Sequence, residues 1–523
     1  MQNGLSEGIG PNLRYDLPAG LVVFLVALPL CLGIALASDA PLMAGLVTGV
    51  VGGLIVGPLS GSQLSVSGPA AGLTVLVAGG IAELGGYELF LPAVIIAGAM
   101  QIVLGLLRGG VLANLFPSSV IEGMLAGIGI ILILKQIPHA LGRDVDYEGD
   151  LDFWLLGAQG NTFTEIVDAF TTMSPGVVIV SLACLGVLLL WQRPFIANQS
   201  WSRTVPGPLV AVVLGIVLNE VFALVAPGLH ISADDGHLVQ LPVMSPQELW
   251  FTLPSPDWSG FGSTELWTVS ATIAAVASLE TLLSVEAVDK LDPFRRISDT
   301  NRELLAQGTG NIVAGLIGGL PMTAVIVRSS TNVYSGGRTR MAAFIHGVFL
   351  VGLVLAVPAL LNRIPLGALA AVLLNIGYKL ARISLWQRMY QQGADQFIPF
   401  TVTVTVTVFS DLLTGVLVGL AFGVVMVVIT NFTTAISVVH EDEAWLVQFT
   451  KDVSFVNKTR LRSVLQSIPK GAEVVIDGTR ASFIDHDIYT TIEDFAKSAP
   501  YRDITVQTRN LASKDHPIRL PGG

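Results

Sequence analysis

Two ionisable residues stand inside long apolar runs, where a charge is costly and usually marks a functional site. Arg328 follows the uncharged stretch Gly318 to Val327, and Glu280 lies in the middle of the run Thr272 to Leu283. An arginine at such a place supplies a fixed positive charge for an anion. A carboxyl group there is pulled in two directions, because desolvation favours its neutral form and a nearby arginine favours its charged form. We predict that Arg328 binds an anion and that Glu280 couples transport to a proton or a cation.

Both residues have a structural alternative that does not involve transport. Arg328 could form an ion pair inside a helix bundle. Glu280 could orient Arg328 or cap a neighbouring helix. The histidines show no pairing at metal-ligand spacing, so we expect neither a metal site nor a cofactor; they include His139, His230, His237 and His346.

The elements that carry these residues are those of a membrane protein. Apolar residues make up 52% of the 523 residues and charged residues 13%, whereas soluble proteins carry about 25% charged residues. Apolar runs of roughly twenty residues, long enough to cross a hydrocarbon core of about 30 Å, recur along most of the chain. We predict about fourteen spans in two sets of seven, at 17–37, 41–58, 68–85, 90–107, 119–136, 172–192 and 205–227, then at 266–288, 303–319, 327–336, 340–360, 366–380, 396–410 and 412–432.

Lysine and arginine gather in alternate connections between these spans. They are frequent from Lys290 to Arg302 and from Lys379 to Arg388, whereas residues 144–152 and 227–265 contain none. Because positive residues stay on the cytoplasmic side, we predict a multi-pass protein of the inner membrane with both termini in the cytoplasm. No nucleic-acid partner is expected; the lipid bilayer is the solvent of the chain.

The two sets of seven spans must be inverted relative to each other, because each set contains an odd number. In such repeats the substrate binds near the midplane, between broken helices. The third span opens with Ser67-Gly68-Pro69-Ala70, and its counterpart opens with a Gly-rich and Pro-containing stretch before Val327-Arg328-Ser329. Both helices look too short to cross, so their free N–H groups would point at one cavity. The alternative is a pair of kinks in ordinary spans. We predict that the substrate-binding residues include Ser67, Gly68, Pro69, Ala70, Val327, Arg328 and Ser329.

The last part of the chain, about residues 437–523, differs from the rest. Polar and apolar residues mix there, and short strand patterns alternate with helix patterns, which indicates a small α/β domain. We predict strands at 444–449, 453–456, 473–476 and 504–507 and helices at 458–466 and 487–497. The chain would then consist of a cytoplasmic segment 1–16, a transmembrane domain 17–436 and this cytoplasmic domain.

Several motifs resemble the SulP family of anion transporters over most of the chain. The most specific stretch is Asn301 to Asn311, followed by Gly318-Gly319-Leu320-Pro321 and later by Ser335 to Thr339. Leu28-Pro29 resembles the motif of the first span, and Phe116 to Gly123 matches the entry to the fifth. In the last domain, Val474 to Asp487 resembles the core of a STAS domain, with His486 at the place where phosphorylatable relatives carry serine.

The resemblance implies the seven-plus-seven inverted-repeat fold, a homodimer, and a core domain of spans one to four and eight to eleven that moves against a gate domain. It places the arginine of the tenth span on Arg328 and the acid of the eighth span on Glu280. It also adds Leu30 and Ile34 to the substrate site, where many relatives carry a glutamine and an aromatic residue.

We therefore expect a secondary-active transporter of a small inorganic anion, with bicarbonate or sulfate favoured. Sodium-coupled bicarbonate relatives carry aspartate at the position of Glu280 and a small residue at that of Arg328, so proton coupling or anion exchange is preferred here. The alternatives are a sodium-coupled bicarbonate or dicarboxylate transporter, a nucleobase permease of the same fold, and an anion channel. No nucleotide-binding loop or nucleophile–base set indicates an enzyme.

Overall fold

The computed structural model describes residues 9–144, 161–197, 199, 205–241, 253–441 and 444–511. The chain forms two compact units, one made of Met1–Gln391 with Phe400–Leu420 and the other of Gln392–Pro399 with Ala421–Gly523. The predicted acidic connection at 144–152 lies outside the described residues except for Asp144, and so does the part of the 227–265 connection between residues 242 and 252.

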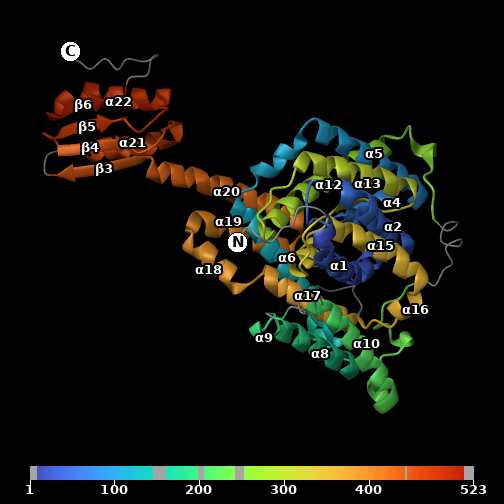
Figure 1. Ribbon diagram of the computed structural model, residues 1–523. Coiled ribbons are helices and arrows are strands. Elements are labelled where there is room, and N and C mark those ends of the chain that lie inside the picture. Colours follow the sequence, from blue (N-terminus) through green and yellow to red (C-terminus); the bar gives the residue numbers. More distant parts are fainter. Residues whose placement is uncertain are drawn as a thin grey trace. The chain divides into compact units, whose positions relative to one another are not determined.

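The first unit is almost wholly helical (Figure 1). Its first half holds α1 (Ile9–Ala37), α2 (Leu42–Val51), α3 (Gly57–Leu59), β1 (Ser67–Pro69), α4 (Thr74–Leu84), α5 (Tyr87–Leu106), α6 (Ser118–Leu141), α7 (Thr162–Thr171), α8 (Pro175–Trp191), α9 (Pro194–Ala197) and α10 (Gly207–Val225). The second half holds α12 (Thr264–Leu291), α13 (Thr300–Leu316), β2 (Met322–Ala324), α14 (Ile326–Tyr334), α15 (Met341–Ala356), α16 (Pro358–Leu361), α17 (Leu366–Leu380), α18 (Ile383–Gln391), the later part of α19 (Ala394–Phe409) and the earlier part of α20 (Leu412–Thr434). The remaining parts of α19 and α20 belong to the second unit.

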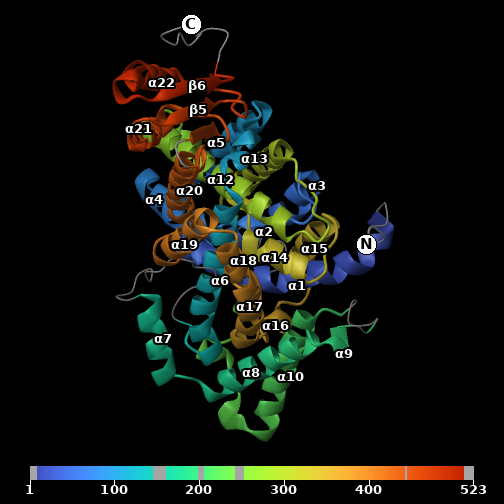
Figure 2. The ribbon, with the colours of Figure 1, turned by 90° about the vertical axis from the view of Figure 1, so that its left-hand side faces the viewer.

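Each of the fourteen predicted spans overlaps one of these helices. Among the described residues, eight helices are long and apolar enough to cross a membrane by themselves, and the pair α7 and α8, bent by 113°, makes up to nine. Other predicted spans correspond to shorter apolar helices, such as α4, α15 and α19. The sequence did not predict α7, because its apolar residues stand on one face only. Figure 2 shows α8 and α10 side by side.

Corresponding helices of the two halves approach each other closely. α6 and α17, the fifth span of each half, meet at Gly129 and Gly377. A Cβ atom on either glycine would lie 2.6 Å from the carbonyl oxygen of the other, which is too close for any side chain. Small residues are the usual means of close packing between membrane helices, since burial of apolar surface gives little driving force there.

The third span of each half begins with a short strand, and the two strands pair. β1 and β2 are antiparallel, with Ser67 opposite Ala324 and Pro69 opposite Met322. The helices that follow are short: α4 has 11 residues and α14 has nine. Nine residues at 1.5 Å each span about 14 Å, less than half of a hydrocarbon core of about 30 Å. Two half-helices are therefore present, and the alternative of kinked full spans is wrong.

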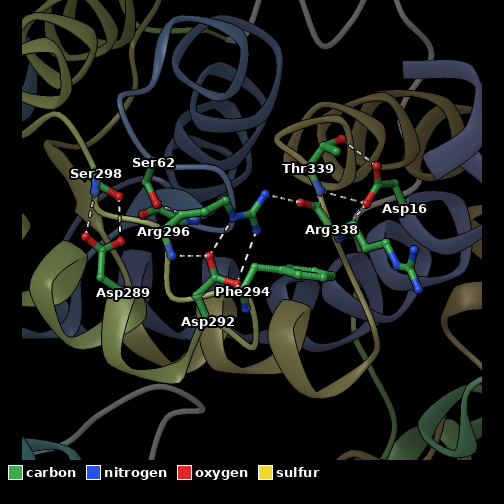
Figure 3. Close-up of polar contacts among 10 residues, drawn as sticks. Asp16, Ser62, Asp289, Asp292, Phe294, Arg296, Ser298, Arg338 and Thr339 are labelled. Carbon is green, nitrogen blue, oxygen red and sulfur yellow. Dashed lines mark hydrogen bonds and ion pairs between the residues drawn. The ribbon is translucent and has the colours of Figure 1, made fainter. Parts of the chain in front are cut away.

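The end of α14 that is farther from β2 is held by a network of charged and polar residues (Figure 3). Asp16 of α1 accepts hydrogen bonds from the backbone N–H groups of Arg338, at 2.7 Å, and Thr339, at 3.0 Å. Arg296, in the segment between α12 and α13, donates to the carbonyl oxygen of Arg338 at 2.8 Å and is paired with Asp292. Three segments far apart in the sequence thus meet just after α14.

The second unit contains a four-stranded sheet in the order β3 (Ile436–Glu441), β4 (Ala444–Phe449), β5 (Glu473–Asp477), β6 (Thr505–Arg509). β3 and β4 are antiparallel, and the other neighbours are parallel. The helices α21 (Lys458–Ser467) and α22 (His486–Ser498) share its hydrophobic core. The sequence-based prediction missed β3, which directly follows a long apolar helix. It was wrong about a strand at 453–456, where only Val453 makes an isolated bridge, to Ile484.

Candidate functional site

Arg328 lies at the third position of α14 and is fully buried. Its Nε, Nη1 and Nη2 atoms have no hydrogen-bond partner among the described residues, and the ion pairs of those residues include none to Arg328. A Cβ atom on Gly68 of β1 would lie 1.9 Å from Nη1, so the guanidinium group occupies the space that the glycine leaves open. The structural ion pair considered as an alternative for Arg328 is therefore not seen in the described part of the chain.

Polar side chains from neighbouring helices satisfy the extended backbone around this arginine. Asn311 of α13 accepts from the backbone N–H of Met322 at 2.7 Å and donates to the carbonyl oxygen of the same residue at 3.1 Å. The Ser329 hydroxyl donates to the carbonyl of Val325 at 2.7 Å and accepts from the N–H of Val66 at 2.9 Å. Backbone groups at this depth need such partners, because lipid offers none.

The signature stretch of the sequence supplies further contacts to the strands. Gln307 of α13 donates to the hydroxyl of Ser67 at 2.6 Å and to Glu303 at 2.9 Å. Glu303 accepts in turn from the backbone N–H of Gly61 at 2.8 Å. Residues of the Asn301–Asn311 stretch thus hold the segment that leads into β1, so their side chains shape the site without forming its surface.

A cavity of about 40 Å³ lies beside Arg328. α1 contributes Leu30 and Ile34, α12 contributes Glu280, and α14 contributes Val327 and Arg328. Five of the ten residues proposed from the sequence therefore line one cavity. The other five form the strand pair and the start of α14, which lie behind the cavity wall; they are Ser67, Gly68, Pro69, Ala70 and Ser329. Ala71, the residue after Ala70, lines the cavity.

Glu280 lies where the other half-helix begins. A Cβ atom on Gly72, in the short helical turn before α4, would lie 3.3 Å from its Oε2 atom. That oxygen has no hydrogen-bond partner in the described part of the protein, and no ion pair with Arg328 is seen there. A carboxylate is favoured near a helix N-terminus by the helix dipole. The two ionisable groups therefore stand at the beginnings of different half-helices, on the walls of one cavity.

Several polar residues around this cavity were not predicted from the sequence. Lys135 and Gln136 of α6 and Ser284 of α12 line it. His346 of α15 is fully buried and feels the charge of Arg328, and neither of its ring nitrogens has a hydrogen-bond partner among the described residues. Lys135 could have been found from its charge alone, because it interrupts the apolar run of the predicted fifth span. His346 gave no such signal.

A second group of ionisable residues lies at the far end of α6. The ring nitrogens Nδ1 of His139 and His237 both approach the carboxylate of Asp144, each at 2.5 Å. Burial alone would raise the pKa of Asp144, but the hydrogen bonds with the two histidines outweigh it and hold that pKa below its ordinary value. The bond to Asp144 raises the pKa of His237. This arrangement ties the end of α6 to the connection between α10 and α12, which carries His237.

The chemistry of the cavity is that of anion binding. A buried guanidinium group without a counter-charge needs an anion to offset its desolvation. The N-termini of two half-helices add positive ends of helix dipoles near the same place. Apolar side chains from α1 and α14 form much of the remaining surface, which strengthens electrostatic attraction by keeping the dielectric constant low.

Comparisons with known proteins agree with these observations. The model of the sulfate permease family matches residues 13–405. The bicarbonate transporter BicA of Picosynechococcus sp. is 26% identical over 388 residues, 73% of this chain and 64% of that protein. The putative sulfate transporter YvdB of Bacillus subtilis is 28% identical over 403 residues, 75% of this chain and 70% of that protein. The match to BicA thus spans slightly less than two thirds of that relative.

Solved structures show the same fold. The transmembrane domain of a cyanobacterial BicA superposes with a TM-score of 0.54 at 25% identity, covering 80% of this chain and 98% of that domain. The murine anion transporter Slc26a9, in its inward-facing state, superposes with a TM-score of 0.64 at 15% identity and covers 97% of this chain and 87% of its own. That likeness includes the C-terminal unit, whose mixed sheet is consistent with a STAS domain. The chain is therefore a multi-pass membrane protein of the sulfate permease (SulP) family, a family of transporters and not of enzymes.

Proposed function

We propose that this protein is a secondary-active transporter that carries a small inorganic anion, bicarbonate or sulfate, across the inner membrane by alternating access. The observation that carries the proposal is the fully buried guanidinium group of Arg328, which has no partner among the described residues and lines a cavity beside two half-helix N-termini. A small cavity lined by a buried guanidinium group suits an inorganic anion better than a nucleobase. Two relatives, a bicarbonate transporter and a putative sulfate transporter, support the same two substrates.

The substrate site of this proposal consists of the cavity residues and of the segments that build it. Arg328 holds the anion, with Val327, Leu30 and Ile34 as the apolar walls. Ser67, Gly68, Pro69, Ala70 and Ser329 fix the crossing strands and the start of α14, and so place the positive ends of the half-helices.

Coupling to a proton, or exchange against a second anion, is assigned to Glu280. A carboxyl group on the wall of the same cavity changes the net charge of the site by one when it binds a proton. Its lack of a hydrogen-bond partner at Oε2 in the described part of the chain leaves it able to respond to the anion. The distribution of Lys and Arg supports a cytoplasmic position for both termini. The protein is expected to form a homodimer.

The test is uptake of labelled bicarbonate and labelled sulfate into proteoliposomes that contain the purified full chain. An imposed pH gradient or a trapped counter-anion supplies the driving force, and sodium is absent. Uptake of one anion would name the substrate and the coupling together. Flux that appears only after sodium or a dicarboxylate is added would overturn this assignment of the coupling.

The variant Arg328→Gln tests the site itself. Because the arginine is buried without a counter-charge among the described residues, its removal should abolish uptake while thermal stability stays equal or rises, as happens when an unpaired buried charge is relieved. A large loss of stability would indicate a structural role instead. Undiminished uptake by the variant would refute the proposed site.

A further inference from the structure

A second and much larger cavity lies at the C-terminal end of α14. Its volume is about 540 Å³, against about 40 Å³ for the cavity beside Arg328. Its walls come from α1, α8, α10, α14, α17 and the connection between α12 and α13. Connections rich in Lys and Arg begin next to it, so it lies on the side predicted to face the cytoplasm. Because pockets of about 300–1,000 Å³ hold organic molecules, this cavity is large enough for an organic ligand.

One wall of this cavity carries a lysine that has no carboxylate partner among the described residues. Lys379 stands in the last turn of α17 and lines the cavity. Its Nζ atom lies 5.1 Å from the centre of the Tyr334 ring, which also lines the cavity. A lysine at a helix C-terminus is stabilised by the helix dipole, and that role alone would let its side chain extend towards water. The contact with Tyr334 instead keeps the ammonium group at the cavity wall, where a negative charge would be favoured.

The same face of α17 carries an amide group whose orientation is fixed. Asn375 lies one turn before Lys379, lines the cavity and is 6% exposed. The Nε2 atom of Gln192 in α8 donates to the carbonyl oxygen of Leu188 at 3.2 Å and to Oδ1 of Asn375 at 2.8 Å. A backbone carbonyl can only accept, so the group that Gln192 shares between its two partners is its NH₂ group. The Nδ2 group of Asn375 is thus left as a donor, and no partner for it is seen in the described part of the chain.

The N-terminus of α10 forms a further part of the wall. Pro206, Gly207 and Pro208 line the cavity. Pro206 is the N-cap of α10 and makes no side-chain hydrogen bond to the first turn. The free N–H groups of a first turn and the positive end of the helix dipole favour an anion. Among the described residues that line the cavity, none is Asp or Glu, so no carboxylate of the wall competes for these donors.

The remaining walls contribute aromatic rings. Tyr15 of α1 and Phe294, which is drawn in Figure 3, line the cavity together with Tyr334. Such rings bury the flat or apolar body of an organic molecule. The ammonium group of Lys379, the amide of Asn375 and the N-terminus of α10 provide donors from three places. A phosphate monoester has three terminal oxygens to accept them, whereas a carboxylate has two.

We propose that this cavity binds an organic phosphate monoester on the side of the protein predicted to be cytoplasmic. The phosphate group lies at Lys379, Asn375 and the N-terminus of α10, and the organic body lies against the aromatic rings. The occupant touches both α17 and the end of α14, whose residue Tyr334 is about 9 Å along the helix from Arg328. Binding therefore restrains the helix that carries Arg328 and slows transport. This last consequence rests on the proposed function, whereas the binding itself does not.

The test measures binding of two phosphate monoesters to the purified full chain. AMP represents a soluble ligand and is followed by isothermal titration calorimetry. Phosphatidic acid represents a lipid and is followed by native mass spectrometry of protein released from mixed nanodiscs. Binding of AMP, or retention of phosphatidic acid in preference to phosphatidylcholine, supports the inference and names the source of the ligand. Binding of neither probe overturns it. Adenosine that binds as tightly as AMP, with no phosphatidic acid retained, also overturns it, because the phosphate would then contribute nothing.

Two variants test the side chains that hold the phosphate. Lys379→Gln removes the charge and should weaken binding of the probe about tenfold or more. Asn375→Asp keeps the size of the side chain but replaces the Nδ2 donor with a negative charge, so it should weaken binding at least as much. The thermal midpoint shows whether each variant is folded, and wild-type affinity in either folded variant overturns the inference. The matched control is Lys290→Gln, which removes a lysine of α12 that donates to the carbonyl of Ser118 and is not among the residues lining the cavity; its affinity should not change.

Arg328→Gln separates this site from the anion site. It should bind the probe with wild-type affinity, because Arg328 is not among the residues that line the larger cavity. Loss of probe binding in Arg328→Gln would mean that the probe occupies the anion site, which overturns the inference and leaves the proposed function standing.

Uptake measurements then test the restraint on α14. A probe on the cytoplasmic side should slow anion uptake several-fold in the wild type and not in Lys379→Gln. Unchanged uptake with the probe bound would overturn the restraint, and so would equal slowing in Lys379→Gln. If no anion is transported at all, the proposed function fails, while the binding results still decide whether the larger cavity is a phosphate site.

Discussion

Replacing Gly68 with alanine should displace Arg328 without touching the cavity surface. The added Cβ atom would lie 1.9 Å from Nη1, whereas ordinary contacts begin at 3.4 Å, so the guanidinium group must retreat by about 1.5 Å. The strand cannot yield instead. Gly68 is paired with Thr323 on one side. On the other side Gly52 lies so close to the strand that a Cβ atom built on it would be 2.3 Å from the carbonyl oxygen of Ser67.

The size of the effect follows from electrostatics. Unit charges about 4 Å apart attract by roughly 4 kcal/mol at an effective dielectric constant of about 20, and by roughly 3 kcal/mol at about 5.5 Å. Loss of one charge-assisted hydrogen bond to the anion adds about 1.5–3 kcal/mol. We therefore expect Gly68→Ala to weaken anion binding by about 2.5–4 kcal/mol, on the order of 100-fold or more.

The assay is the concentration dependence of labelled anion uptake in proteoliposomes, together with the thermal unfolding midpoint of the purified protein. Gly79→Ala is the matched control, because Gly79 lies in α4 and a Cβ atom there meets nothing within 4 Å. It should keep wild-type uptake and gain slightly in stability. Wild-type affinity in Gly68→Ala would mean that the guanidinium group is not the ligand, or that it moves freely.

Two further changes test the coupling and the Asp144 cluster. Glu280→Gln should still bind the anion, but its uptake should no longer depend on an imposed pH gradient, because the site can no longer take up the proton. Unchanged pH dependence of uptake would assign the coupling to another group. His237→Gln should lower the thermal midpoint more at about pH 6 than at about pH 9, by no more than about 3 °C. The hydrogen bond with Asp144 raises the pKa of His237. The stabilisation of the fold by this bond is therefore complete below the unfolded pKa of about 6.5 and is lost as pH rises through the folded pKa. An equal shift of the thermal midpoint at both pH values, measured by scanning fluorimetry, would refute this reasoning.

The pattern of charges and apolar runs was enough to predict the membrane fold and the two ionisable residues of the cavity wall. Arg328 and Glu280 could be named because a charge inside an apolar run is rare. The half-helices were predicted because Gly and Pro interrupt corresponding spans in both halves.

Other parts of the site depend on contacts that no local pattern reveals. The role of Ser67 and Ser329 is set by Gln307 and Val66, which are hundreds of residues distant from their partners. Lys135 was not predicted as a site residue because the apolar run around it indicates only a membrane span. Whether its side chain faces the cavity depends on the rotation of α6 about its axis. The contact of two histidines with Asp144 could not be predicted either, because His139 and His237 are almost a hundred residues apart in the sequence.

α14 is held at both of its ends, because the strand pair and the bond between Val66 and Ser329 fix its beginning as well. Asp16 and Arg296 hold the Arg338 segment just beyond its C-terminal end, while Arg328 stands near the opposite end. A tilt of about 5° along a rod of about 14 Å moves one end by about 1 Å relative to the other. The position of Arg328 is therefore set by two separate attachments, and a shift at either end of α14 would move it relative to the cavity.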